Sequence, residues 1–550
     1  MMEDELTLQL VYRMSDFITA RESCKKMNQE MHADVVVLGG GTGGTAAALA
    51  AAKSGKTVIL TEETTWIGGQ LTSQAVPPDE HRWIESFGCT RSYRQFRQGV
   101  RDYYKQYFPL TAEARALPHL NPGNAIVSRV AHEPRTAVAV LNQMLAPYVH
   151  SGRIQILYRH VLEAAETGGD QVSAVTVRDL EEGTRRTLLA PYYIDATECG
   201  DLLPLAGIEY VTGAESIHDT GEPHAVDGPA DPMEMQGFTY CFAMDYIDGE
   251  DHTIERPAMY DFWRDYKPDF WPDHLLSMAG VRPMTLEAIE YGLFPDSERF
   301  SLYLYRQLID HNQFAPGTFS GPLTLVNWPQ NDYWLGSIID VSEEERALHL
   351  EQAKQLSLSW LYWLQTEAPR PDGKRGYPGL RLRPDVVGTQ DGLAMYPYIR
   401  ESRRIEAEFR VLEQHVATDC RPSGVAETFA DTVGIGSYRI DLHPSTANRT
   451  YIDISSLPFQ IPLGSLIPKR VTNVLAGCKN LGVTHITNGC YRLHPVEWNI
   501  GEAAGYCVSY ALDRDLTPSA VRNTESELKA FQQRLVQEGI ELAWPTVGAV

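Results

Sequence analysis

Five glycines lie within the six positions Gly39–Gly44, between an apolar run and an alanine-rich run. The surrounding stretch Val35–Ala52 holds eighteen uncharged residues in a row, a length that begins to suit a membrane span. Each glycine, however, costs a helix roughly 1 kcal/mol relative to alanine. The pattern therefore predicts two strands and a helix instead of a span: Val35–Leu38, Thr45–Lys53 (the helix) and Thr57–Leu60.

Gly39, Gly41 and Gly44 occupy the positions of a G-x-G-x-x-G motif at the turn between the first strand and the helix. The first glycine permits the sharp turn, the second lets the backbone approach a pyrophosphate, and the third lets the helix pack on the sheet. Glu62 ends the second strand, 18 residues past Gly44, where an acidic side chain binds ribose hydroxyls. The segment predicts a dinucleotide site. A Walker A loop is excluded, because no Gly-Lys-Ser/Thr follows.

Composition narrows the possible partners. The chain has 48 Lys and Arg against 72 Asp and Glu, a formal net charge of −24, which disfavours nucleic acid and anionic membrane. The acidic start lacks a signal sequence, so a cytoplasmic location is expected. The eight cysteines form no C-x-x-C pair, so no metal site, iron–sulfur cluster or dithiol is predicted.

The sequence predicts five segments. Alternating short apolar runs at 153–189 predict a β-meander that leads into a strand at Tyr192–Ala196. The middle of the chain is rich in aromatics and proline, contains a strong helix at Glu343–Glu367, and includes Met259–His274, which suits a packed flap or a subunit contact of a homo-oligomer better than a substrate lid. Near the end, a strand at Val474–Ala476 and, after a long loop, a helix at Glu497–Leu512 return to the nucleotide-binding pattern. The expected segments are an N-terminal extension (1–32), a nucleotide-binding part (33–215), a substrate or cap domain (216–460), a return of the nucleotide-binding part (461–515) and a C-terminal helix (516–550).

Several separated blocks together resemble the FAD-dependent oxidoreductase family of the glutathione-reductase-like flavoprotein superfamily. They are "VVVLGGGTGGTAAALAAAKSGKTVILTEE", "WIGGQLTSQAVPPDEH", "YYIDATECGDLLPLAG", "NWPQNDY", "YPYIRESRRI", "GIGSYRIDLHP", "SLIPKRVTNVLAGCKNLGVTH" and "CYRLHPVEWNIGEAAG". The resemblance implies an α/β protein: a Rossmann-like FAD-binding domain with a β-meander, plus an inserted α+β substrate domain.

The resemblance also implies which residues hold FAD. The glycines of the first turn would meet the pyrophosphate and Glu62 the ribose, while Val161 would bind adenine through its backbone. The flavin would lie along a later loop, beside the strand that ends in Ala-Thr, and at the N-terminus of the helix expected at Glu497–Leu512, whose dipole would stabilise negative charge on the reduced ring. Glu198 stands where the family usually has glycine. The implied FAD contacts are Gly39, Gly41, Gly43, Gly44, Glu62, Gly68, Gly69, Gln70, Val161, Ala196, Thr197, Asn499 and Ile500.

Histidines are the candidate bases, because an unperturbed pKa of about 6.5 suits proton transfer at neutral pH. His443 and His494 are preferred, since each precedes a proline that restricts its backbone. His485 and His81 are the other candidates. His81 and Cys89 are also possible points of covalent flavin attachment, although no motif requires it.

Arg400 is a candidate contact for an acidic or hydroxylated substrate, whereas Arg404 is expected to form an ion pair with Glu401 or Glu406 on a helix. The segment Val433–Tyr438 has no third glycine and no Ala-rich helix after it, so no second dinucleotide motif for NAD(P)H is predicted.

These observations predict an enzyme that oxidises a polar small molecule (an alcohol, polyol, sugar or amine) by hydride transfer to FAD, with oxygen or a soluble acceptor removing the electrons. Two alternatives stay open. One is an oxygen-using monooxygenase or related tailoring enzyme, although the "GWxWxIP" motif of halogenases does not occur. The other is a non-catalytic flavin-binding protein.

Overall fold

The computed structural model describes residues 29–296, 298–447 and 451–549. At its centre is a five-stranded sheet in the order β22-β8-β2-β3-β4, in which every neighbouring pair is parallel. The strands are β2 (Val35–Leu38), β3 (Val58–Glu62), β4 (Ile154–Tyr158), β8 (Tyr192–Asp195) and β22 (Val474–Ala476). The predicted β–α–β unit and the return of the chain to this sheet near residue 474 are therefore confirmed.

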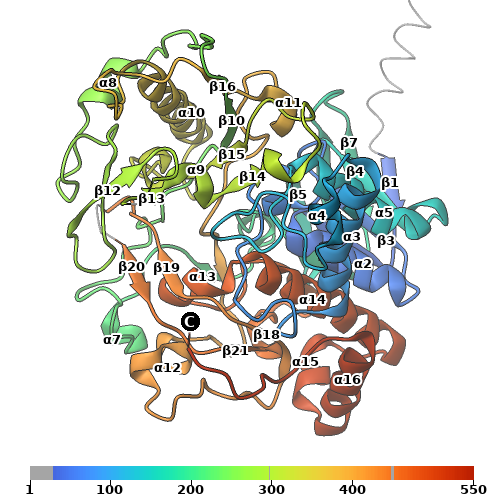
Figure 1. The fold of residues 1–550 in the computed structure, drawn as a ribbon. Helices are drawn as coiled ribbons and strands as arrows, with labels where there is room; N and C mark the ends of the chain where they lie inside the picture. Colours follow the sequence, from blue (N-terminus) through green and yellow to red (C-terminus); the bar gives the residue numbers. More distant parts are fainter. Residues whose placement is uncertain (1–28, 297, 448–450, 550) are drawn as a thin grey trace, which may run out of the picture.

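Two helices from opposite ends of the sequence pack against each other (Figure 1): α2 (Thr42–Lys53) and α14 (His494–Arg514). A Cβ added to Gly501 would lie 1.9 Å from the carbonyl oxygen of Gly43, and one added to Gly505 would lie 2.3 Å from that of Ala47. Only glycine permits backbones to approach this closely. Gly501 and Gly505 therefore allow the close contact between these two helices.

A second sheet packs beside the first. Its strands β5 (His160–Gly168), β6 (Gln171–Asp179) and β7 (Arg185–Leu189) form the predicted antiparallel meander. The strand β1 (Gln29–His32) adds to β7 in parallel. The prediction of a helical or loose extension over 1–32 was wrong for these four residues, because their backbone pairs with β7, and residues 1–28 lie outside the described part of the chain.

A separate core of aromatic side chains lies in the middle of the sequence, around a four-stranded sheet in the order β14-β15-β10-β16. The helix α10 (Glu343–Thr366) confirms the predicted helix almost to the residue. It begins with a capping box of Ser342 and Glu345, which satisfies two free N–H groups. The aromatic stretch at 259–274 contains α8 (Tyr260–Asp265) and buries Trp263 and Trp271 in this core, as a packed flap would.

The α14 helix begins at His494, three residues before the predicted start, and the expected long loop before it contains α13 (His485–Tyr491). The remaining strands are β9 (Tyr210–Val211), β10 (Phe242–Tyr246), β11 (Ala279–Val281), β12 (Ala288–Gly292), β13 (Phe300–Ser301), β14 (Gln307–Ile309), β15 (Leu323–Val326), β16 (Leu380–Leu382), β17 (Arg404–Ile405), β18 (Thr432–Gly436), β19 (Ile440–Leu442), β20 (Ile452–Ile454) and β21 (Phe459–Pro462). The remaining α-helices are α3 (Arg91–Tyr107), α4 (Ala112–Ala116), α5 (Pro134–His150), α6 (Leu202–Leu205), α7 (Ile217–Thr220), α9 (Leu302–Tyr305), α11 (Pro384–Val387), α12 (Glu413–Val416), α15 (Pro518–Asn523) and α16 (Glu525–Glu538).

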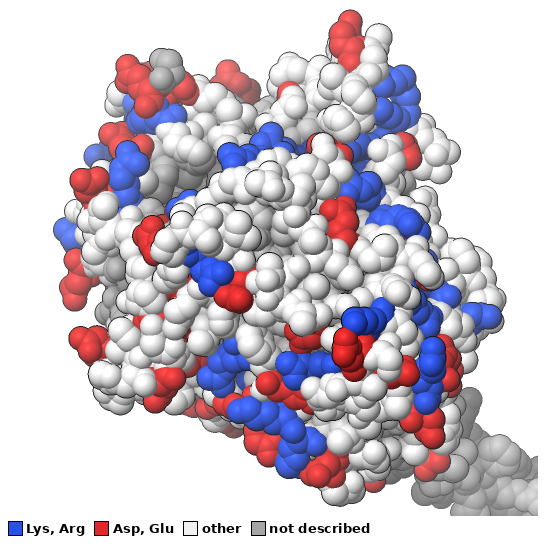
Figure 2. Space-filling model, turned by 90° about the horizontal axis from the view of Figure 1, so that it is seen from below, with Lys and Arg blue, Asp and Glu red and all other residues white. Residues whose placement is uncertain are grey.

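Among the described residues, no helix combines the length and the apolar character that crossing a bilayer requires. Basic and acidic side chains are intermingled on the face seen in Figure 2. The segment Val433–Tyr438 contains β18, which pairs antiparallel with β21, so it does not start a β–α–β unit.

Candidate active site

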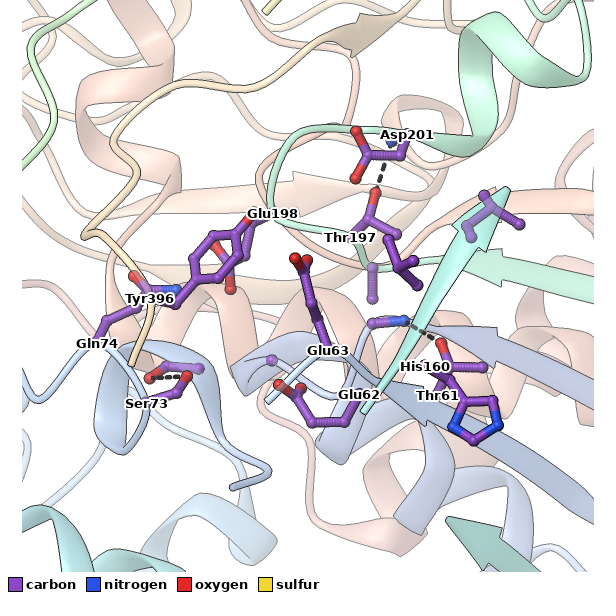
Figure 3. A pocket seen from close by; sticks show the side chains of 16 residues that line it. Thr61, Glu62, Glu63, Ser73, Gln74, His160, Thr197, Glu198, Asp201 and Tyr396 are labelled. Carbon is purple, nitrogen blue, oxygen red and sulfur yellow. Dashed lines mark hydrogen bonds between the residues drawn. The ribbon is translucent and has the colours of Figure 1, made fainter. Parts of the chain in front are cut away.

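A cavity lies where the strands of the parallel sheet end (Figure 3). This edge is where open α/β sheets bind their ligands. It brings together the turn after β2, the end of β3, the start of β5 and the segment after β8. The predicted FAD contacts that line it are Gly39, Gly41, Glu62, Gly69, Val161, Ala196 and Thr197.

The glycines of the motif have two different roles. A Cβ on Gly39, Gly43 or Gly44 would lie 2.4, 2.0 or 1.8 Å from a backbone carbonyl oxygen, so the fold itself requires glycine there. A Cβ on Gly41 would come close only to the Glu198 carboxylate, at 2.8 Å, and would otherwise project into the cavity. The backbone itself leaves room for a side chain at position 41, so a glycine there fits the expectation that it meets a pyrophosphate.

Gln74 is a second indication that the cavity suits a polar ligand. Its side chain is fully buried, lines the same cavity, and has no hydrogen-bond partner on either its amide nitrogen or its oxygen. An unpaired buried amide is costly. A polar cofactor in the cavity would supply the missing partners.

Glu62 lies at the end of β3, as predicted, and its Oε1 accepts hydrogen bonds from the backbone N–H and the hydroxyl of Thr64, at 2.8 and 2.7 Å. Burial raises the pKa of Glu62 to about 7, and the bonds from Thr64 oppose this only in part. Ribose hydroxyls that donate hydrogen bonds to this carboxylate would stabilise its charged form.

Next to the glycine turn lie three charged side chains, which the sequence did not single out as a group. Lys479 is fully buried and forms an ion pair with Glu198, and its Nζ lies 3.7 Å from Oε2 of Glu497. Glu497 accepts hydrogen bonds from the Gly43 N–H (3.3 Å) and from the amide of Gln70 (2.7 Å). Burial alone lowers the pKa of Lys479, but the two carboxylates raise it further than burial lowers it, so the lysine stays charged.

A larger cavity lies beside the aromatic core. Its walls contain aromatic rings and paired charges, and all but two of its lining residues, Asp79 and Arg492, come from the middle of the sequence. The polar side chains are Asp79, Arg282, Glu290, Glu298, Arg299, Arg306, Asn327, Arg400, Asp441, His443, Asp453 and Arg492, and the aromatic ones are Tyr291, Phe300, Tyr305, Trp328 and Tyr398.

His443 faces this cavity at the end of a chain of buried polar contacts. Its Nδ1 lies 2.6 Å from Oδ2 of Asp332, and Oδ1 of Asp332 accepts a bond from Arg400 at 2.9 Å. Burial raises the pKa of Asp332, but Arg400 and His443 outweigh burial and hold it below its usual range. Asp332 thus accepts the Nδ1 proton and fixes the ring, while Nε2 lies 3.6 Å from Oδ2 of Asp441.

Arg400 is held in place by four acceptors. It donates to the carbonyl of Gly237 (2.8 Å), the hydroxyl of Thr239 (2.9 Å) and the side-chain oxygens of Asn327 (3.1 Å) and Asp332. Its guanidinium thus lines the cavity but donates most of its hydrogen bonds to protein acceptors. Its main effect is therefore on the position and charge of Asp332.

A chain of hydrogen bonds through Gln70 runs between the walls of the two cavities. Tyr398, which lines the large cavity, donates to Oε1 of Gln70 at 3.3 Å, and Arg492 donates to the Tyr398 hydroxyl at 3.2 Å. Gln70 follows Gly69, which lines the smaller cavity.

The other candidate histidines do not line the large cavity. His494 is fully buried; its Nδ1 accepts from the Asp79 N–H (3.1 Å) and its Nε2 bonds the Val76 carbonyl (3.2 Å). His81 bonds the Gly88 carbonyl and the Trp83 N–H. Burial lowers the pKa of each to about 4. Both rings have filled their bonding capacity inside the protein.

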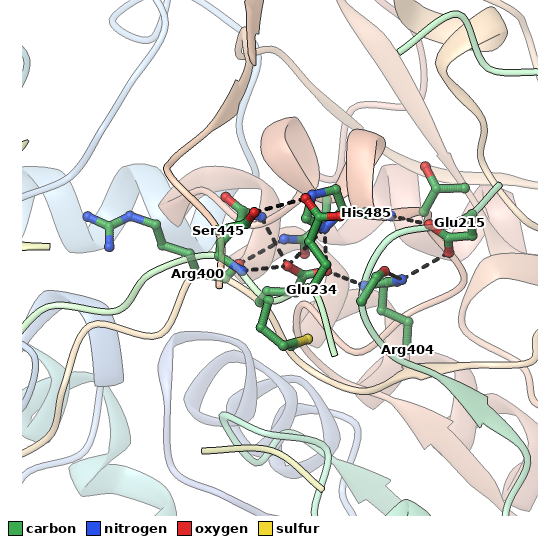
Figure 4. A network of polar contacts seen from close by, with 12 residues as sticks. Glu215, Glu234, Arg400, Arg404, Ser445 and His485 are labelled. Atoms are coloured by element: carbon green, nitrogen blue, oxygen red, sulfur yellow. Dashed lines mark hydrogen bonds and ion pairs between the residues drawn. The ribbon is translucent and has the colours of Figure 1, made fainter. Parts of the chain in front are cut away.

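His485 lies in a buried network shown in Figure 4, with Nδ1 2.9 Å from Oε1 of Glu401. Burial alone lowers its pKa, but Glu401 raises it overall. Arg404 forms the predicted ion pair with Glu401 and a second one with Glu215, at 2.9 Å. The expected helix there was wrong, because Arg404 begins the two-residue strand β17.

Four other predicted contacts lie away from both cavities. Asn499 bonds the backbone of Ile435 and Val433 in β18, at 3.2 and 3.4 Å, because α14 starts earlier than expected and Asn499 falls in its second turn. Ile500 is fully buried, Gly68 packs on Leu141 and Thr72, and Cys89 is buried with its pKa raised to about 12.

A parallel sheet with a β–α–β unit and a glycine cradle at its edge is the arrangement of a dinucleotide-binding protein. The match to a family model agrees. The chain belongs to the FAD dependent oxidoreductase family, whose model matches residues 34–535. Its cofactor is FAD, and it is an enzyme; a non-catalytic flavin-binding protein is thereby set aside.

Solved structures show only distant likeness, and no curated protein matches the chain. A geranylgeranyl bacteriochlorophyll reductase-like protein from Thermoplasma acidophilum has 10% identity over 93% of this chain and 85% of its own, with a TM-score of 0.34. The FAD complex of glycerol-3-phosphate dehydrogenase from Bacillus halodurans has 15% identity over 41% of this chain and 42% of its own, with a TM-score of 0.24. A myxobacterial chondrochloren halogenase has 15% identity over 40% and 45%, with a TM-score of 0.21. The chain thus spans less than half the length of the last two.

Proposed function

We propose that the chain oxidises a polar small molecule, such as an alcohol, polyol, sugar or amine, in the large cavity, with His443 as the proton acceptor. The observation that carries the proposal is the chain Arg400–Asp332–His443, which ends with an imidazole at a polar cavity. When bound, FAD supplies the acceptor for a hydride. Oxygen or a soluble molecule would then take the electrons away.

The contacts around His443 suit this role. Asp332 accepts the Nδ1 proton and so fixes both the tautomer and the orientation of the ring. It also stabilises the imidazolium that forms when Nε2 takes a proton from a hydroxyl or amine. The paired charges of Arg306 with Asp79, at 2.7 and 3.2 Å, offer donors and acceptors to a polar substrate.

We also infer that the chain is a member of the glutathione-reductase-like superfamily and that residues 216–460 are its substrate domain. The parallel sheet with its β-meander supports the first inference. The origin of nearly all lining residues of the large cavity in that segment supports the second.

The test is an anaerobic screen of the FAD-loaded enzyme against alcohols, polyols, sugars and amines, followed by bleaching of the flavin absorbance. Bleaching by one class identifies the substrate type. If no organic compound bleaches the flavin but NADPH does so once an organic compound is bound, the enzyme is a monooxygenase and the proposal is wrong.

A further inference from the structure

The smaller cavity has the wrong charge for a pyrophosphate. Among its described lining residues are four carboxylates, Glu62, Glu63, Glu198 and Asp201, and no lysine or arginine. The pyrophosphate of FAD adds two negative charges, and like charges a few ångströms apart repel strongly where water is largely excluded. A cation must therefore reach the phosphates from behind the wall.

Glu198 occupies the place where the phosphates are expected. Its Oε1 lies 2.8 Å from the Cβ position of Gly41 and 2.9 Å from that of Gly69. Both glycines line the cavity, as does Gly39. The carboxylate thus fills the space that the missing side chains leave open, and an oxygen of a phosphate group cannot share that space.

Cations act on three of the four acids of this wall, and Lys479 is the one that pairs with the acid beside the glycines. The charge of Arg346 acts on both Glu63 and Asp201. Glu198 pairs with Lys479, which is fully buried and does not line the cavity, so the carboxylate stands between the lysine and the cavity.

The N-terminus of α2 offers fewer hydrogen-bond donors to a phosphate than a helix N-terminus usually does. The N–H of Gly43 in the first turn of α2 already bonds Glu497 at 3.3 Å, which removes one donor that such a turn normally offers to phosphate. Lys479 lies near this turn, with Oε2 of Glu497 3.7 Å from its Nζ.

We propose that Glu198 is a displaceable carboxylate that closes the phosphate subsite in the FAD-free protein, and that Lys479 neutralises the pyrophosphate once Glu198 has moved aside. FAD binding then exchanges one anionic partner of Lys479 for another. The buried lysine keeps a counter-charge in both states, which avoids leaving it unpaired in the interior.

The test compares two probes on protein stripped of FAD: ADP, which carries the pyrophosphate, and adenosine, which does not. Their affinities are measured by calorimetry for wild type, Glu198→Ala, Lys479→Met and Lys479→Arg. Glu198→Ala should tighten ADP binding about tenfold, and Lys479→Met should weaken it by a similar factor. Lys479→Arg should restore most of the loss, and adenosine should bind all four proteins alike.

Glu63→Ala is the matched control, because Glu63 lines the same cavity but is not near Gly41; it should change ADP binding much less than Glu198→Ala does. Weaker FAD binding by Glu198→Ala, with ADP unaffected, would make Glu198 a ligand of FAD hydroxyls and overturn the proposal. Equal changes for ADP and adenosine would also overturn it. If Lys479→Met does not fold, Lys479→Arg and Glu198→Ala still decide.

Discussion

Replacing Gly41 by alanine should remove FAD while leaving the fold intact, whereas the same change at Gly44 should damage the fold itself. On Gly41 the new methyl group meets only the end of the Glu198 side chain, at 2.8 Å, and the next atom is 3.9 Å away. The FAD-free protein should lose no more than about 1 kcal/mol, the difference between glycine and alanine at an N-cap. On Gly44 the methyl would lie 1.8 Å from the carbonyl oxygen of Gly39.

A backbone collision of that kind forces α2 away from the sheet and should cost about 3 kcal/mol, the upper end for overpacking. Urea unfolding of the two FAD-free variants measures this difference, and fluorescence titration with FAD measures binding. Gly41→Ala should weaken FAD binding at least about 100-fold. Full flavin content in Gly41→Ala, or equal loss of stability in both variants, would refute the reasoning about which glycine serves the ligand.

Three further outcomes are expected. Glu62→Ala should weaken FAD binding by about 10- to 100-fold in the same titration, because it removes charge-assisted hydrogen bonds worth roughly 1.5–3 kcal/mol; unchanged affinity would assign the ribose to another residue. Because the pKa of Glu62 is raised to about 7 in the fold, the folded state binds more protons than the unfolded one, so stability of FAD-free protein should fall as pH rises from about 4.5 through 7. Glu62→Gln should flatten this part of the pH profile in thermal melts, and a parallel profile would contradict it. His443→Asn should slow flavin reduction by the identified substrate by about 10²–10⁴ with FAD still bound; normal bleaching of the flavin in this variant would assign the base to another residue. In the wild-type enzyme, NADH or NADPH alone should leave the flavin oxidised for minutes. Rapid bleaching by either nicotinamide would favour a reductase or monooxygenase.

The parts of the fold that could be predicted are those in which local pattern and global position agree. The run Val35–Leu38 and the alternation after Arg153 specify strands by themselves. The start of α14 could not be predicted, because Pro495 is as compatible with the first turn of a helix as with the loop before it. The strand at Gln29–His32 depends on pairing with β7, which lies more than 150 residues away.

The candidate site shows the same division. A motif placed Gly41 and Glu62 at the cofactor cavity, since their roles depend on spacing along the chain. Lys479 and Gln74 belong to no motif and are recognised only by burial and missing or paired partners in space. His443 and His494 share the same His-Pro pattern, and only the three-dimensional surroundings separate a ring that faces a cavity from one whose bonds are filled.

The contact between α2 and α14 has a consequence for how the chain is made. The ribosome completes the glycine turn early in synthesis, but the helix that covers α2 emerges more than 400 residues later. Until then the face of α2 that packs on α14 has no partner, and closing so long a loop is slow. The nascent chain therefore passes most of its synthesis without a finished cofactor site and with an alanine-rich surface that a chaperone would be expected to bind.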